Sequence, residues 1–476
     1  MENGNFVLYV MNDTHYVSKK IWVEGDPING REKGDVIAIK NTPEILNSFF
    51  DKIIADKSAD ALLIIGDLVN NGDRISHADF RDELTRLTDA GIRVFVTTAT
   101  HDYNGKKQDE NFFNACRYTE TGTEDIEWYY KTDLPEFYAD YGTGKADCVH
   151  AESGSYSVKL TDGLRLVAIN DNGNGRSHCG LFEDGVEWLK NEFEKARAGG
   201  EKVFCCVHHP VLPPWPVYQR AADFELYGGY KELREILCEY GVKVIFTGHT
   251  HVQGIRKYES EKGGFFYDVA TAAIPSAFGK MRRVCVTPDG TCDISSVGIE
   301  EIKGVDTQGL SAPEYIYGLN FTGLVEKSFP LALTDTPAFF KAVGRVFDTK
   351  KLEGHPAAFR FAAKKLGNAT LALPAKIAGK HAGLSADEKK KAKQTPLMPV
   401  VFTILRRIFA GNAPYTSDTV EYKSLMGMLR RAISTAKKFG VDTDNLMKGL
   451  TLEELAAPFL SAECRTGDDD NLRTDL

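Results

Sequence analysis

Short apolar runs alternate with helix-patterned segments through the first 300 residues of this 476-residue chain. Residues 6–11 and 61–65 are continuously apolar, as strands buried on both faces are. Residues 183–197 instead space their apolar side chains at helical intervals, and two glycines end that helix. Further helices are predicted at 43–54, 77–87 and 229–240, and further strands at 93–97, 155–160, 164–169, 203–207 and 242–246. This alternation predicts an α/β architecture.

Residues 300–476 have a different pattern, in which prolines interrupt helical stretches and strands do not recur. We therefore predict two domains, an α/β domain over 1–299 and a mostly helical domain over 300–476 that ends in an acidic, frayed tail. The net charge changes at the same boundary, from −13 in the first part to +4 in the second. Because a nucleic-acid footprint needs a basic face, the acidic first domain argues against nucleic acid as a partner.

Compartment and membrane contact are constrained by what the sequence lacks. No apolar run approaches the roughly 18–20 residues of a membrane span, and no signal peptide is visible before Phe6. The nine cysteines have no paired C-x-x-C spacing, so we expect reduced thiols and a cytoplasmic location. An apolar stripe over 400–408, with basic neighbours, has two interpretations: a helix packed in a core, which we favour, or peripheral contact with an anionic membrane. The sequence does not predict an oligomeric state.

Carboxylate and imidazole side chains follow the predicted strands at their carboxyl ends. In open α/β sheets, ligands bind in the crevice beyond these ends. Residues i and i+2 of an extended backbone point the same way, so each D-x-H or H-x-H pair can reach one site. Carboxylate plus imidazole is a ligand set for Mn, Fe or Zn. The residues concerned are Asp13, His15, Asp67, His101, Asp102, His208, His209, His249 and His251.

The ordered blocks D-x-H, G-D, A-T-H-D, H-H-P and G-H-x-H resemble those of the calcineurin-like metallophosphoesterase family over about residues 5–295, and the pattern is closest to that of bacterial members of unassigned substrate. The resemblance implies a two-sheet αββα sandwich that binds two divalent transition metal ions (Mn, Fe or Zn). It implies that Asp13, His15 and His251 bind the first ion, that Asp67 bridges both, and that His208 and His249 bind the second.

The resemblance also implies the reaction. We expect a metal-dependent phosphoesterase that hydrolyses a phosphate mono- or diester by attack of a hydroxide shared between the ions. His101, oriented by Asp102, would protonate the leaving group, a step that contributes typically ~10²–10⁴-fold. Asn71 could reach a phosphate oxygen or cap a loop. His209 could face the substrate or support the neighbouring ligand.

Position 100 departs from the family, which has asparagine where this chain has Thr100. A threonine hydroxyl is a shorter and poorer metal ligand than an amide oxygen. Thr100 could bind weakly, a water could replace it, or the second site could be partly filled; we expect a weakened second site in an active enzyme. The alternative is a sensor or scaffold with an impaired metal site that acts through the helical domain. A nuclease of the same superfamily is disfavoured by the charge of the first domain.

A histidine and two sets of aromatic residues lie outside these blocks. His77, beside Asp79 at the start of a predicted helix, is expected at the surface. The aromatic residues 128–130 lie in a long insertion, and Trp215 follows the histidine block. These aromatic side chains could cover the substrate as a lid, or could only pack against one another.

Overall fold

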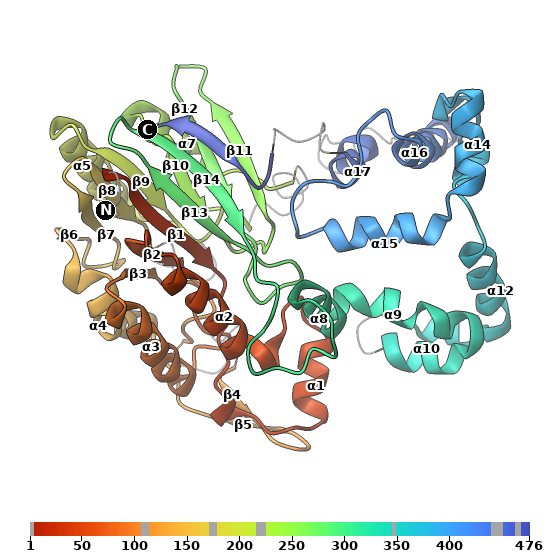
Figure 1. The fold of residues 1–476 in the computed structure, drawn as a ribbon, viewed down its shortest axis with the longest axis horizontal. Helices are drawn as coiled ribbons and strands as arrows, with labels where there is room; N and C mark the ends of the chain where they lie inside the picture. Colours follow the sequence, from red (N-terminus) through yellow and green to blue (C-terminus); the bar gives the residue numbers. More distant parts are fainter. Residues whose placement is uncertain are drawn as a thin grey trace.

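The computed structural model describes residues 4–105, 114–170, 179–215, 225–344, 349–438, 451–461 and 468–476. Its first part contains two facing sheets with helices outside them, and its second part is helical (Figure 1). Both chain termini lie beside the sheets, so the chain leaves the α/β part, forms the helices and returns.

The first sheet has the order β15-β14-β13-β1-β2-β3. Strands β1, β2 and β3 are parallel, and Asn12, Ile65 and Thr97 lie in one row across them. The carboxyl ends of these strands therefore meet at one edge of the sheet. The strand bounds are β1 Phe6–Asn12, β2 Ala61–Ile65, β3 Arg93–Thr97, β13 Met281–Val286, β14 Thr291–Val297 and β15 Leu472–Asp475.

The second sheet has the order β11-β12-β10-β9-β8-β7-β6. Its central strands β8, β9, β10 and β12 are parallel, with Ala168, Cys206 and Phe246 in one row. His208 and the G-H-x-H block follow β9 and β10 at this edge. The bounds are β6 Cys148–Val149, β7 Tyr156–Thr161, β8 Leu164–Ala168, β9 Lys202–Cys206, β10 Val244–Thr247, β11 Gly254–Glu259 and β12 Phe265–Ala270; β4 Cys116–Tyr118 and β5 Thr123–Asp125 pair separately.

Three hydrophobic layers hold the α/β part together. Leu8 and Leu63 of the first sheet meet Phe204 and Phe246 of the second in a core between the sheets. Helices α2 (Thr42–Ala55) and α3 (Arg74–Asp89) cover the outer face of the first sheet. Helices α5 (Glu183–Ala198) and α7 (Tyr230–Tyr240) cover the second. The predicted α/β fold, an αββα sandwich, is confirmed.

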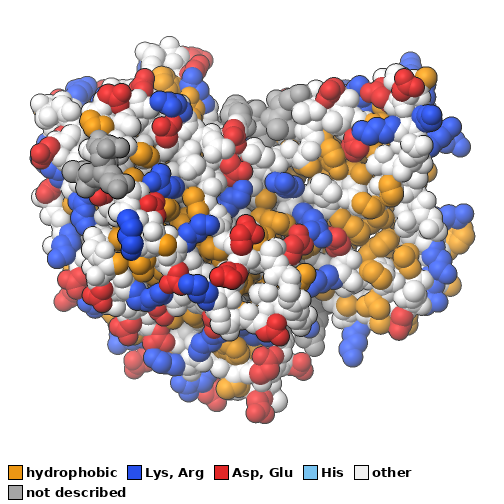
Figure 2. Space-filling model, viewed as in Figure 1, with side chains coloured by type: hydrophobic (Ala, Val, Ile, Leu, Met, Phe, Trp, Pro, Cys, Tyr) orange, Lys and Arg blue, Asp and Glu red, His pale blue; other side chains and the backbone are white. Residues whose placement is uncertain are grey.

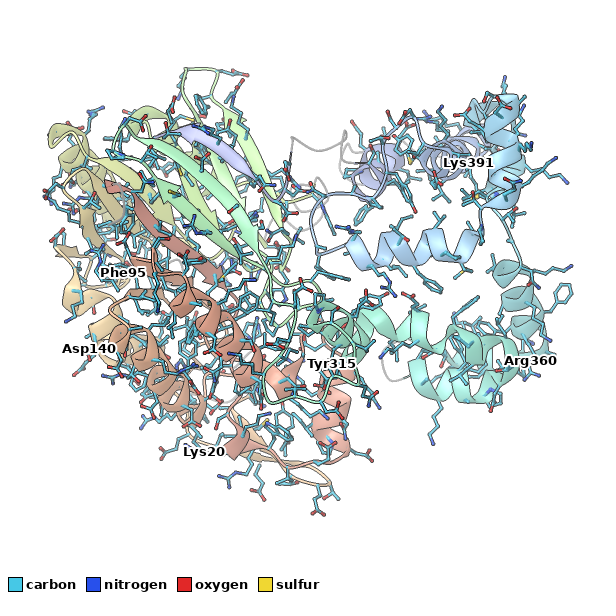
Figure 3. All side chains as sticks on the ribbon, viewed as in Figure 1. Lys20, Phe95, Asp140, Tyr315, Arg360 and Lys391 are labelled. Carbon is cyan, nitrogen blue, oxygen red and sulfur yellow. The ribbon has the colours of Figure 1, made fainter. Side chains whose placement is uncertain are left out.

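The second part consists of helices, as predicted, and hydrophobic side chains gather on the face of it seen in Figure 2. Its first helix, α8, packs with the α/β core through Ile316, and Tyr315 lies at the junction (Figure 3). The division at residue 300 stays a prediction. The helices are α8 Ala312–Leu319, α9 Phe321–Thr334, α10 Thr336–Val343, α11 Lys350–Glu353, α12 Pro356–Gly367, α13 Ala372–Ala378, α14 Ala386–Gln394, α15 Leu397–Arg407, α16 Val420–Lys438 and α17 Leu452–Leu460; α1 Asp26–Lys33 and α4 Leu134–Phe137 lie in the first part.

The chain's acidic tail is not frayed, which corrects our expectation. Its last residues form β15, which pairs antiparallel with β14. Asp469 is fully buried, accepts a hydrogen bond from the backbone N–H of Asn412 and forms an ion pair with Arg256. The buried guanidinium of Arg282 donates to the Asp469 carbonyl. A strand partner and buried cations thus order a segment whose composition alone indicates disorder.

The apolar stripe over 400–408 lies on α15, and its contacts match the packed-helix interpretation. Val400 is buried in a core with α13, α14 and α16, and Ile404 packs against the same cluster. Arg406 binds the carboxylates of Glu314 and Glu326. Among the described helices, none combines the length and apolarity that crossing a bilayer requires. None of the eight described cysteines is paired in a disulfide.

Candidate metal centre

The loops after five strands bring the predicted metal ligands to one place between the sheets. Three overlapping groups each place their ligand atoms within 4.8 Å of one another. The first group contains Asp13, His15 and His251; the second His15, Asp67 and His101; the third Asp67, His208 and His249. Asp67 and His15 belong to two groups each, so the three groups form one continuous cluster.

Asp13 and Asp67 are both buried, and each uses one carboxylate oxygen for the backbone. Asp13 Oδ2 accepts the N–H of His249 at 2.9 Å, and Asp67 Oδ1 accepts the N–H of His101 at 2.9 Å. The other oxygens face the imidazoles. Asp67 Oδ2 lies 3.1 Å from Nε2 of His208 and 3.9 Å from Nε2 of His15, between the two groups. This position suits a carboxylate shared by two ions.

The backbone at the cluster adopts a conformation that side-chain-bearing residues rarely adopt. Of the eight described non-glycine residues with positive φ, five are predicted metal ligands. Such strain persists where the surrounding structure enforces it, and it is concentrated at functional sites. The five are Asp13, His15, Asp67, His249 and His251, with φ between 42° and 65°.

Two glycines make room for this convergence. A Cβ atom at Gly66, which has a φ of +68°, would lie 2.6 Å from Nδ1 of His208. A Cβ atom at Gly248 would lie 2.6 Å from Oδ2 of Asp13. The G-D and G-H-x-H blocks therefore need glycine because the ligand side chains occupy the space beside it.

The donor set fits divalent metal ions. Asp13 Oδ1 is buried, and no hydrogen bond of good geometry reaches it within the described part of the chain, although Nε2 of His251 lies 3.4 Å from it. The Nε2 atoms of His15 and His251 face each other at 3.1 Å. Burial would raise the pKa of Asp13, but His208 and His251 outweigh it and hold that pKa below its ordinary value. Ionised carboxylates with convergent imidazoles are ligands for transition metals.

Two of the candidate ligands, His208 and His249, each have a partner for one ring nitrogen. His208 Nδ1 donates to the Ile65 carbonyl at 2.8 Å, which leaves Nε2 toward Asp67. Nε2 of His249 lies 2.6 Å from the Glu225 carboxylate. The His209 ring lies against the His249 ring at an interplanar angle of 35°, with centroids 3.9 Å apart. Our sequence reasoning missed Glu225, because it reaches the site from a loop outside the family blocks and no spacing marks it.

Thr100 lies in the loop after β3, between Ala99 and His101. Ala99 is fully buried, and its N–H donates to Asp102 Oδ2 at 2.8 Å. The loop is therefore held in place at both neighbours of position 100. The weak metal ligation by Thr100 stays a prediction.

His101 is oriented differently from our expectation. Its Nδ1 donates to the Asn70 carbonyl at 2.7 Å, whereas the Asp102 carboxylate accepts the N–H groups of Val69 and Ala99. Asp102 thus fixes the two loops that flank His101, and a backbone carbonyl orients the ring. Burial raises the pKa of Asp102 well above its ordinary value, and the negative charge of Asp67 adds to this.

His77 is buried, which contradicts the predicted surface position. Its Nε2 donates to the Asp102 carbonyl at 2.8 Å, and its Nδ1 accepts from the Tyr138 hydroxyl at 2.7 Å. The exposed residue of this turn is Arg74, whose guanidinium covers the Tyr129 ring. Tyr129 also packs against His77, so this aromatic residue of the insertion has packing partners rather than a free position over the site.

Asn71 and Trp215 are both buried. Asn71 Oδ1 accepts a hydrogen bond from the Asn70 side chain, and its carbonyl accepts one from Asn104. These contacts suit loop ordering, and substrate contacts by Asn71 and His209 stay predictions. The Trp215 ring packs on Phe459 of α17, with centroids 4.3 Å apart. The neighbouring Pro216 lies outside the described residues.

The chain was compared with solved structures, curated proteins and protein families. Among solved structures, a dimetal phosphatase from Danio rerio is 12% identical with a TM-score of 0.43, and the match covers 62% of this chain and 96% of that chain. A purple acid phosphatase from yellow lupin is 11% identical with a TM-score of 0.41, covering 63% and 53%. A search of curated proteins gave no match. A model described as calcineurin-like phosphoesterase matches residues 6–253, more than half of the sequence. The chain belongs to the calcineurin-like phosphoesterase family.

Proposed function

We propose that this hydrolase cleaves a phosphate mono- or diester at a two-metal centre built from the residues of the cluster. The observation that carries the proposal is the convergence of two buried carboxylates and five imidazoles in three overlapping groups, each with its ligand atoms within 4.8 Å of one another. Asp13, His15 and His251 would hold one ion and His208 and His249 the other, with Asp67 shared. Two such ions, when bound, activate a water molecule and neutralise charge on the phosphate oxygens.

The proposed proton donor is His101. Its Nδ1–H bond to the Asn70 carbonyl fixes the ring, which meets the His15 ring edge-on with centroids 4.6 Å apart. Nε2 is then the ring atom that would carry a proton to the leaving oxygen. Burial lowers the pKa of His101 to about 3, while the negative charge of Asp67 acts in the opposite direction. An anionic substrate beside the ring would likewise favour the protonated form that this role needs.

The decisive experiment is turnover of a chromogenic phosphate ester by chelator-treated protein supplied with Mn²⁺, Zn²⁺ or Fe²⁺. We expect hydrolysis with at least one of these ions and its loss in Asp67→Asn, because that variant removes the shared carboxylate. Asp289→Asn, in a surface turn, is the matched control and should behave as the parent. Metal binding without turnover of any phosphate ester would contradict the proposal and support a sensor. Turnover that increases with oligonucleotide length would indicate a nuclease instead.

A further inference from the structure

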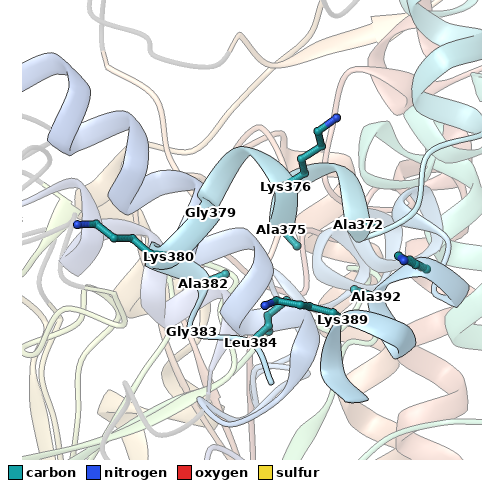
Figure 4. A pocket seen from close by; sticks show the side chains of 11 residues that line it. Ala372, Ala375, Lys376, Gly379, Lys380, Ala382, Gly383, Leu384, Lys389 and Ala392 are labelled. Atoms are coloured by element: carbon teal, nitrogen blue, oxygen red, sulfur yellow. The ribbon is translucent and has the colours of Figure 1, made fainter. Parts of the chain in front are cut away.

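The helical part contains a cavity of about 530 Å³ that belongs to no site described above. It lies at α13, the short turn Gly379–Ala382 that follows it, and α14 (Figure 4). Small apolar side chains line its floor, namely Ala372, Ala375, Ala382, Leu384 and Ala392. Four lysines belong to the same lining, and none of the described lining residues is acidic: Lys376, Lys380, Lys389 and Lys393.

The positive charge of these four lysines is not compensated within the described part of the chain. None of the four forms an ion pair there, and all four are exposed. On α14 and α16, Glu388 binds Lys423 at 2.6 Å and Glu421 lies 3.9 Å from Lys391. Asp387, also on α14, forms no ion pair with the four lysines in the described part of the chain. A cavity with an apolar floor and four uncompensated ammonium groups is complementary to an anion that carries apolar groups.

Exposed apolar side chains lie on α13 and on the preceding helix, α12. Leu373 and Ile377 lie one turn apart on α13 and are 41% and 50% exposed, and Phe361 on α12 is 65% exposed. Five of the nine exposed large hydrophobic side chains among the described residues lie between positions 352 and 377. Basic and hydrophobic side chains adjoin each other on the helical part (Figure 2). Soluble surfaces rarely concentrate exposed apolar groups in this way without a binding role.

We propose that this basic apolar surface, defined by the four lysines with Leu373 and Ile377, binds an anionic lipid bilayer. A lipid phosphate would occupy the cavity beside the lysines, and the two aliphatic side chains would enter the interfacial region. A free inorganic anion would explain the lysines but leave the exposed leucine and isoleucine without a partner. The surface is distinct from the buried stripe of α15, and the proposal does not depend on catalysis at the metal centre.

The test is co-sedimentation of the full chain with phosphatidylcholine vesicles, with and without added phosphatidylglycerol. The variant Lys376→Gln, Lys380→Gln, Lys389→Gln, Lys393→Gln removes the charge and keeps the side-chain length. The matched control carries four exposed lysines of the α/β part changed to glutamine: Lys33, Lys57, Lys231 and Lys262. Each lysine near an anionic surface contributes roughly fivefold in affinity, so the cavity variant should bind roughly a hundredfold or more weakly than the control.

A second variant separates the apolar contribution from the charge. Leu373→Ser, Ile377→Ser should weaken vesicle binding while the salt dependence of the remaining binding is kept. Equal binding to neutral and anionic vesicles, or equal binding by the cavity and control variants, would overturn the proposal. So would calorimetric binding of glycerol phosphate without vesicle binding, which would assign the cavity to a soluble anion. Thermal unfolding checks that each variant is folded, and no outcome depends on phosphoesterase turnover.

Discussion

The carboxylate of Glu225 accepts the Nε2 proton of His249 across 2.6 Å, which leaves Nδ1 as the nitrogen of that ring with a free lone pair. His208 has the opposite arrangement, since its Nδ1 donates to Ile65 and its Nε2 is directed at Asp67. The hydrogen bond to His249 lowers the pKa of Glu225, so the carboxylate stays ionised. Carboxylate–histidine pairs of this kind fix the tautomer of a metal ligand and raise its basicity.

Glu225→Ala should therefore weaken binding of the second metal ion. Loss of such a partner typically costs ~10–100-fold in metal affinity, and we expect a change of that size in a calorimetric titration with Mn²⁺ or Zn²⁺. Binding of the first ion should change little, because Glu225 contacts neither His15 nor His251 in the described structure. Glu232→Ala, an exposed glutamate of α7, is the control. Two unchanged binding steps would show that Glu225 does not support the centre.

Thr100→Asn should strengthen the second site, because an amide oxygen is the better ligand. The backbone around position 100 is held by the bonds of Ala99 to Asp102 and of His101 to Asp67, so the new side chain replaces the old one without moving the loop. Metal content after dialysis should rise toward two ions per chain. Thr121→Asn, in the exposed loop between β4 and β5, is the control. If metal content and turnover both stay at the parental level, position 100 is not part of the site.

The convergence of the candidate metal ligands could be predicted from the sequence because strand ends and i, i+2 spacing are local properties of the chain. Asp13, His15 and Asp67 each follow a strand that the apolar pattern indicated, and the parallel registers of the sheet bring them together. Glu225 and Asn70 act through contacts between different loops, and such contacts leave no periodic trace. The predicted surface position of His77 was wrong because its two hydrogen-bond partners, Asp102 and Tyr138, come from segments 25 and 61 residues away.

His101→Gln should slow hydrolysis according to the leaving group. The glutamine retains a polar side chain but cannot donate a titrating proton, so an alkyl phosphate should be hydrolysed ~10²–10⁴-fold more slowly. An activated aryl phosphate, whose leaving oxygen needs no proton, should lose much less. Steady-state rates for the two esters give this ratio, and His150→Gln, far from the cluster, serves as the control. An equal loss for both esters would assign His101 to ion or phosphate binding.

His77 should make the fold sensitive to acid. Burial lowers its pKa to about 4 in the folded chain, against about 6.5 when unfolded, so the unfolded chain binds the proton more readily between these values. The stabilisation from the neutral, buried His77 is therefore fully present above pH 6.5 and is lost as the pH falls toward 4. Over this range the free energy of unfolding should decrease by roughly 3 kcal/mol on account of His77. Urea unfolding of the parent and of His77→Gln across this range should show the parent's steeper decline. Parallel declines would mean that His77 does not titrate with unfolding.

Asp469→Ala should destabilise the chain, because the tail is tied to the loop that follows the metal ligands. The buried carboxylate pairs with Arg256 on β11 and accepts the N–H of Asn412, while Gln253, two residues after His251, bonds to the Phe409 carbonyl. Removing one partner of a buried pair typically costs ~3–5 kcal/mol, since the other charge stays buried. Asp475→Ala, at an exposed position of β15, should change the free energy of unfolding by less than about 0.5 kcal/mol. Denaturant titrations of both variants test this prediction. Equal, small changes in the free energy of unfolding would favour the frayed tail that the sequence predicted.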